Sequence, residues 1–175
     1  MNLHATIVES LIPSAGDVCD ARAGKYLTFQ LSREEFGIRV LQVHEIVGPQ
    51  EISAVPRTPA YIKGVIDLRG KVVPVIDLRL KFGMAAAECT QRTCIIVTQV
   101  RGESGTVLVG IVVDGVSEVL HLAGPEIEDL PDRGGEYSAG YVLGMARVKG
   151  KVKILLDIER VLSTQDLRNL TSMLA

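Results

Sequence analysis

The sequence has little of what disulfide-bonded, nucleic-acid-binding or membrane-spanning proteins need. Its three cysteines, Cys19, Cys89 and Cys94, are odd in number and irregularly spaced, which suits reduced thiols better than a disulfide framework. Tryptophan is absent, aromatic residues make up 4% of the chain and the formal net charge is -2, so we expect no platform or basic groove for nucleic acid. No apolar run approaches the roughly 18 residues that a membrane-spanning helix requires, which argues against direct membrane insertion.

The N-terminal segment also lacks the features of an export signal. No Lys or Arg precedes Arg22, and Glu9, Asp17 and Asp20 interrupt the apolar residues. A secretory signal begins with basic residues and continues as an uninterrupted apolar stretch. We therefore predict a cytoplasmic protein in which residues 1–24 form a flexible N-terminal tail.

Motifs for catalysis are missing as well. The chain has no Gly-rich phosphate loop, no dinucleotide-binding glycine pattern and no paired histidines for zinc, and its cysteines lack a second pair of metal ligands. His44 and His121 lie beside no evident nucleophile that they could activate. Asp67 and Asp77 could form an acid/base pair, but they fit polar roles at strand ends at least as well. We predict a protein that is not an enzyme and that needs no cofactor and no metal.

What the chain has in quantity is aliphatic side chains. Hydrophobic residues make up 47% of its 175 residues, so with few aromatics the interior must consist of Val, Ile and Leu. The β-branched members of this set favour strands, and we predict an all-β fold. A chain of this length buries roughly 70% of its unfolded surface, which is enough for a core without disulfides. Strand-like segments cover residues 26–31, 36–47, 52–55, 65–68, 72–78, 93–100 and 109–120.

The second half of the sequence repeats the first. At an offset of 73 residues, Glu45 and its neighbours match Glu118 and its neighbours. At an offset of 80, the segment GVIDLRGKVVPVIDL, which begins at Gly64, matches GMARVKGKVKILLDI, which begins at Gly144. Self-similarity on this scale indicates duplicated structural units. The quoted segments read as two β-hairpins with Arg69 and Lys149 at their tips.

One local prediction rests on the same repeat. Asp114-Gly115 alone would indicate a hairpin turn, but its counterpart Leu41-Gln42 would not. We therefore predict that residues 36–47 and 109–120 each form one long strand, with a bulge at this point.

The duplication also suggests the architecture. We predict two small closed β-barrels over about residues 25–84 and 92–162, since closure removes the free edges that each unit would otherwise expose. The segment 26–31 could complete the second unit instead of the first, so an exchange of strands stays open. After Ser163, leucines at helical spacing predict a C-terminal helix over residues 163–175.

Three segments resemble signature regions of the CheW coupling proteins of bacterial chemotaxis. They are FGIRVLQVHEIV (36–47), TPAYIKGVIDLRGKVVPVIDLRLKFG (58–83) and VGIVVDGVSEVL (109–120), and the resemblance extends from about Tyr26 to Leu162. It implies two tandem SH3-like five-stranded β-barrels with short helices. It also implies a non-enzymatic adaptor that binds the cytoplasmic tip of methyl-accepting chemoreceptors and the regulatory domain of a CheA-type histidine kinase. The kinase and receiver domains of related proteins have no counterpart in this sequence, which indicates a stand-alone coupling protein.

The resemblance implies a partner-binding surface too. By motif position, Val43 and Glu45 on the long strand, with Gly64 and Arg69 on the hairpin, are expected near a receptor-binding groove. Simpler roles are available, because valines on strands are usually core residues and glycines often relieve backbone strain. Arg69 could likewise be a solvated turn residue, as Lys149 could be. We favour a partner role for Arg69, because a guanidinium on a rigid hairpin can hold a partner's carboxylate, or that of Glu45, with two hydrogen bonds.

The main alternative function is a β-barrel module that binds nucleic acid or peptides. Barrels that bind single strands present aromatic side chains in a basic groove. The three Phe and four Tyr residues are scattered through an acidic chain, which offers neither feature.

Overall fold

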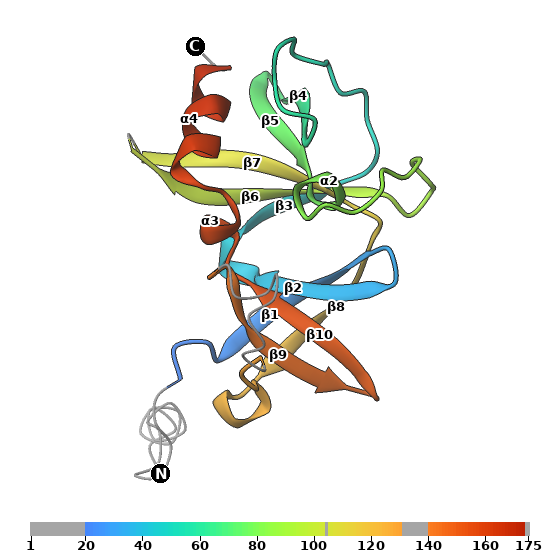
Figure 1. Ribbon diagram of the computed structural model, residues 1–175, viewed down its shortest axis with the longest axis vertical. Coiled ribbons are helices and arrows are strands. Elements are labelled where there is room, and N and C mark those ends of the chain that lie inside the picture. Colours follow the sequence, from blue (N-terminus) through green and yellow to red (C-terminus); the bar gives the residue numbers. More distant parts are fainter. Residues whose placement is uncertain (1–19, 104, 131–139, 174–175) are drawn as a thin grey trace, which may run out of the picture.

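The computed structural model describes residues 20–103, 105–130 and 140–173, and in this part the chain forms two five-stranded β-sheets (Figure 1). The prediction of a mainly β protein with five-stranded units is confirmed. The strands are β1 (Gly24–Leu31), β2 (Glu34–Arg39), β3 (Val43–Val47), β4 (Ile62–Leu68), β5 (Lys71–Asp77), β6 (Cys94–Gly102), β7 (Gly105–Val113), β8 (Gly115–Leu122), β9 (Val142–Val148) and β10 (Lys151–Leu156). The helices are η1 (Val40–Gln42), α2 (Leu78–Lys81), η2 (Gly124–Glu126), α3 (Ile158–Val161) and α4 (Thr164–Ser172).

Two predictions touch the ends of the described part. Of the tail predicted over residues 1–24, residues 1–19 lie outside what the structure describes. Helix α4 occupies most of the segment 163–175, whose last two residues also lie outside it. None of the helices that the structure describes is long and apolar enough to cross a membrane.

Neither sheet comes from one continuous stretch of chain. Sheet A has the strand order β8-β1-β2-β10-β9, and sheet B has the order β3-β6-β7-β5-β4. The chain passes from sheet A to sheet B at η1, between β2 and β3, and returns at Asp114, between β7 and β8. Figure 1 shows the two sheets one above the other, each with strands from both halves of the sequence.

The long strands predicted over 36–47 and 109–120 are therefore divided where the chain changes sheet. The predicted bulge at Asp114-Gly115 is wrong, because the chain leaves sheet B there, and β7 and β8 do not pair with each other. The Asp114 side chain holds this crossing in place. Its Oδ2 accepts a hydrogen bond from the Ser32 N–H (2.7 Å), and the same carboxylate forms an ion pair with Arg79 of α2.

The sheets curl, but they do not close into the barrels that we predicted. In sheet B, Ser53, which follows β3, forms a single bridge with Val65 of β4. In sheet A, Glu128, which follows β8, forms a single bridge with Met145 of β9. Each bridge joins the two edges of its sheet at one residue pair only. In sheet B the prolines that follow Ser53 have no backbone N–H, so they cannot donate hydrogen bonds that would extend the bridge into a ladder. The molecule thus consists of two open, curled sheets.

The two repeated hairpins have the same turn. The β4–β5 hairpin turns at Arg69-Gly70 and the β9–β10 hairpin at Lys149-Gly150, and all four residues have positive φ. The φ angle is 52° for both Arg69 and Lys149. Two-residue turns with this conformation follow the right-handed twist of paired strands, so each turn presents its basic side chain from a defined backbone.

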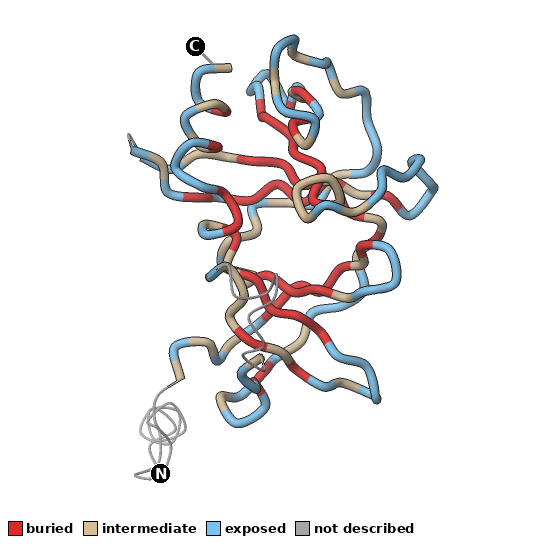
Figure 2. The backbone as a smooth tube through the Cα atoms, in the orientation of Figure 1, coloured by how far each residue is buried: buried red, intermediate tan, exposed pale blue. Residues whose placement is uncertain are grey.

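Three hydrophobic clusters hold the fold together, and buried segments run along the strands of both sheets (Figure 2). The largest cluster contains residues of both sheets, such as Phe29 and Ile96, and therefore joins them. Each sheet also encloses a smaller cluster, which includes Ile66 in sheet B and Tyr26 in sheet A. Helix α4 packs on the shared cluster through the fully buried Leu170.

A buried carboxylate fixes the start of α4. Asp166 accepts hydrogen bonds from the Tyr61 hydroxyl, from Lys81 Nζ (2.7 Å) and from the Ser163 N–H (2.9 Å). Burial alone would raise the pKa of Asp166, but the hydrogen bonds outweigh it and hold this pKa below its usual value. Burial, together with the neighbouring carboxylate, raises the pKa of Tyr61 to about 12. These contacts connect α4 to α2 and to the approach of β4.

Sheet A contains a buried ion pair between neighbouring strands. Lys153 Nζ of β10 lies 2.5 Å from Glu35 Oε2 of β2, and the two side chains are 5% and 11% exposed. The hydrogen bond from Lys153 is the main reason that the pKa of Glu35 is lowered. Glu118 of β8 lies 3.9 Å from the same ammonium group, so two carboxylates face one buried cation.

Candidate functional site

The structure brings Glu45 and Arg69 together across the open edges of sheet B. Glu45 lies on β3 at one edge of the sheet, and Arg69 lies at the tip of the hairpin that includes β4, the other edge strand. Arg69 Nη1 donates to Glu45 Oε2 at 3.2 Å, and Nη2 donates to Oε1 over a shorter distance. This two-point contact, with the bridge between Ser53 and Val65, links the two edges.

The ion pair is solvent-accessible on its Arg69 side. The Arg69 side chain is 71% exposed and the Glu45 side chain 23%. The hydrogen bond from Arg69 is the main reason that the pKa of Glu45 is lowered, and the same bond raises the pKa of Arg69. Exposed ion pairs contribute little to folding stability, so this contact is better suited to presenting charge than to holding the fold. The guanidinium keeps donors that a partner could use.

A histidine extends this charged cluster along β3. His44 Nε2 lies 3.6 Å from Glu45 Oε1, and His44 Nδ1 lies 3.0 Å from the side-chain amide nitrogen of Gln99 on β6. Four side chains from β3, β6 and the β4–β5 hairpin therefore form one continuous polar row. The sequence reasoning considered His44 only as a candidate base. It missed the contact with Gln99, because these residues are 55 positions apart.

Aliphatic residues lie on β3 and β8, the edge strands of the two sheets that begin where the chain changes sheet. Val43 of β3 and Val116 of β8 are partly buried and pack against the shared core. Ile46 and Val119, on the same two strands, are 43% and 55% exposed. Val43 and Val116 are 73 residues apart, and so are Ile46 and Val119, which is the offset of the sequence repeat. This repeat is the signal in the sequence that could have added Val116, Ile46 and Val119 to the candidate residues. Leu41 in η1 is 93% exposed as well.

Gly64 differs from the other three predicted site residues, because the fold itself requires it. Its φ is 141°, and a Cβ atom at this position would overlap the Ser53 carbonyl group, with 2.7 Å to the carbonyl carbon. Gly144 has a φ of 159°, and its Cβ would lie 2.7 Å from the carbonyl oxygen of Glu128. Both glycines thus leave room for the single bridge that connects the edges of their sheet.

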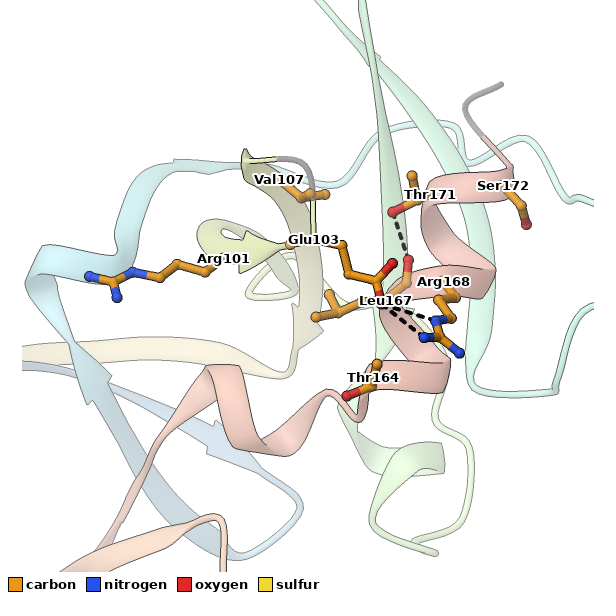
Figure 3. A pocket seen from close by; sticks show the side chains of 9 residues that line it. Arg101, Glu103, Val107, Thr164, Leu167, Arg168, Thr171 and Ser172 are labelled. Carbon is orange, nitrogen blue, oxygen red and sulfur yellow. Dashed lines mark hydrogen bonds and ion pairs between the residues drawn. The ribbon is translucent and has the colours of Figure 1, made fainter.

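Nothing in the described residues resembles a catalytic centre. A cavity of about 470 Å³ lies between the β6–β7 hairpin and α4 (Figure 3). Arg168 donates to Glu103 at 3.0 Å, Leu167 lines the cavity, and Arg101 points away from α4. None of the predicted site residues lines this cavity. No group of three or more His, Cys, Asp or Glu side chains in the described part could hold a metal ion.

Four aromatic rings in the described part of the chain pack against one another inside the molecule. Phe29, Phe36, Phe82 and Tyr141 form a continuous row, with ring centroids 6.0, 5.8 and 5.5 Å apart. All four pack in or against the cluster that joins the two sheets. Because these rings pack against one another, they do not form a platform for nucleic-acid bases.

Comparison with known proteins identifies the family. The model of the CheW-like domain matches residues 25–166, which is most of the chain. The chain belongs to the CheW family. The chemotaxis protein CheW of Klebsiella aerogenes is 39% identical over 143 residues, covering 82% of this chain and 84% of that protein. The chemotaxis protein CheW of Rhizobium meliloti is 33% identical over 140 residues, covering 80% and 88%.

A solved CheW structure has the same fold. The crystal structure of the scaffolding protein TtCheW from Thermoanaerobacter tengcongensis matches with a TM-score of 0.72 and 31% identity, covering 82% of this chain and 95% of that one. The sequence resemblance to CheW is thereby confirmed. The polar row on β3 and the β4–β5 hairpin lies within the segment that matches the CheW-like domain.

Proposed function

We propose that this CheW-family chain is a non-enzymatic, cytoplasmic adaptor in bacterial chemotaxis. It holds a CheA-type histidine kinase, through the regulatory domain of that kinase, next to the cytoplasmic tip of methyl-accepting chemoreceptors. The names of its relatives, a chemotaxis protein and a scaffolding protein, support this function. The two curled sheets would correspond to two SH3-like units, each with its own exposed edge.

The observation that carries the proposal is the exposed pair of Arg69 and Glu45 at the open edges of sheet B. A scaffold needs a surface that is fixed before its partner arrives, since ordering flexible side chains reduces affinity. The positive-φ turn and the contact with Glu45 hold the guanidinium of Arg69 in place. Ile46 of the same edge strand is 43% exposed and offers apolar area at this edge of sheet B.

We assign a different role on this surface to each of the predicted residues. Arg69 and Glu45 present charge to the receptor, and Val43 supplies an apolar contact at the start of β3. Gly64 belongs to the site because it permits the bridge between Ser53 and Val65, which sets the position of the hairpin.

A binding experiment with repeat-matched variants tests the proposal. Arg69→Ala should fold with a near-normal melting temperature, because the pair is exposed, and should bind a receptor cytoplasmic fragment at least about tenfold more weakly. Glu45→Ala should act in the same direction, and the double variant should lose less than the sum, because the two side chains form one contact. Lys149→Ala, at the matching hairpin tip of sheet A, should bind receptor normally.

Two results would contradict this assignment. One is normal receptor binding by Arg69→Ala. The other is a loss of binding that merely follows a lowered melting temperature. Isothermal calorimetry and thermal unfolding on the same samples separate these cases.

A further inference from the structure

The row Gln99, His44, Glu45 and Arg69 contains one histidine, the residue type that can change its charge between about pH 5 and pH 8. An amide nitrogen only donates, so Nδ1 of neutral His44 accepts from Gln99 and the imidazole hydrogen lies on Nε2. This Nε2 is the nitrogen nearest to Glu45, at 3.6 Å from Oε1. The same oxygen accepts a hydrogen bond from Nη2 of Arg69. The imidazole and the guanidinium therefore both lie near one carboxylate oxygen.

The surroundings of His44 leave Glu45 as its main electrostatic neighbour. Glu45 is the charged side chain that lies within ion-pair distance of His44 in the described part of the chain. Strand β6 contributes the neutral Gln99, and the β4–β5 hairpin contributes Arg69, which contacts the carboxylate. The His44 side chain is 38% exposed, so protons exchange freely with solvent.

We infer that His44 is a proton-sensitive positioning residue, which tunes the charge of the Arg69–Glu45 contact and thereby the strength of partner binding. When His44 is neutral, the positive charge of Arg69 and the negative charge of Glu45 balance, and the row has no net charge. Protonated His44 gives the row a net positive charge and offers the carboxylate a second cation. Glu45 still holds the guanidinium of Arg69 in place, and the added positive charge attracts a carboxylate on the receptor surface more strongly.

The inference rests on the proposed function only for the identity of the partner. Histidine is the residue type whose charge can change between about pH 5 and pH 8. Gln99 keeps its contact in either state, because its amide can turn to present oxygen to a protonated Nδ1. Receptor binding should therefore strengthen as the pH falls from about 8 to about 5.5, and the change should depend on His44.

The first experiment needs no receptor. Carbon-detected NMR would follow the carboxyl carbon of Glu45 and the guanidinium carbon of Arg69 from about pH 8 to about pH 5.5. Both signals should move together in the wild-type protein and stay constant in His44→Gln. His121→Gln, which removes an exposed histidine from sheet A, is the matched control and should behave like the wild type. Signals that do not move, or that move equally in His44→Gln, would overturn the inference.

The second experiment measures affinity for a receptor cytoplasmic fragment at the same two pH values. The wild type and His121→Gln should bind about threefold to tenfold more tightly at the lower pH, and His44→Gln should show no such change. Weaker wild-type binding at low pH, or the same change in His44→Gln, would overturn the inference. If the wild type binds no receptor at any pH, the proposed function fails, and the NMR signals still decide whether His44 controls the pair.

Discussion

Replacing Gly64 by alanine should destabilise the protein strongly. The φ angle of 141° is accessible to glycine, and an added Cβ would overlap the Ser53 carbonyl. The chain would have to leave this conformation and break the bridge, in which Ser53 N–H donates to Val65 and Val65 N–H donates to Ser53, both at 2.9 Å. Backbone strain of this kind costs about 1–3 kcal/mol, and each backbone hydrogen bond contributes about 1 kcal/mol. We expect Gly64→Ala to lower the free energy of unfolding by about 3–5 kcal/mol.

Chemical denaturation followed by circular dichroism measures this loss. Gly70→Ala is the control, because Gly70 also has positive φ, 86°, but an added Cβ would meet no atom within 4 Å. That variant should lose only about 1–2 kcal/mol. The reasoning is refuted if Gly64→Ala loses no more stability than Gly70→Ala. A Gly64→Ala protein with wild-type stability and impaired receptor binding would instead make Gly64 a direct contact residue.

Two further predictions concern buried charges. Asp166→Asn should free the start of α4, seen as faster hydrogen exchange in this helix. Because the pKa of Asp166 is lowered in the folded state, its contribution to stability is complete above the usual Asp value of about 4 and is lost as the pH falls below it. The protection factors of the wild-type α4 amides, which correct for the slower intrinsic exchange in acid, should therefore fall in acid, with less pH dependence in Asp166→Asn. Glu35→Gln should lower the free energy of unfolding, measured by chemical denaturation, by about 2 kcal/mol or more, because Lys153 stays buried without its main partner. The double variant Glu35→Leu with Lys153→Met removes both charges, and its free energy of unfolding should lie within about 1 kcal/mol of the wild-type value.

The parts of the fold that could be predicted from the sequence are those that depend on residues close together in the chain. Gly70 and its repeat Gly150, each between two strand-like runs, correctly indicate two hairpins, because such turns need residues that accept positive φ. The match of Gly64 with Gly144 also has a physical cause, since each makes room for a carbonyl group. The family resemblance is confirmed over most of the chain.

The parts that could not be predicted depend on which sheet a strand joins. Alternating aliphatic residues identify a strand, but they do not show where it changes sheet, so the divisions at η1 and Asp114 were missed. Closure was wrongly expected, because the sequence shows strands but not whether their edges meet along a ladder. The burial of Lys153 and the contact of His44 with Gln99 depend on residues that are distant in sequence. The receptor contacts of Val43, Glu45, Gly64 and Arg69 stay predictions.

The central claim is that this chain couples receptors to a kinase, and kinase activity tests it most directly. The measurement is autophosphorylation of a CheA-type kinase mixed with receptor-containing membranes, with and without the chain and with or without receptor ligand. We predict that ligand changes the kinase rate only when the chain is present, that Arg69→Ala reduces this control, and that Lys149→Ala retains it. Ligand control of equal size without the chain, or no control with it, would contradict the account.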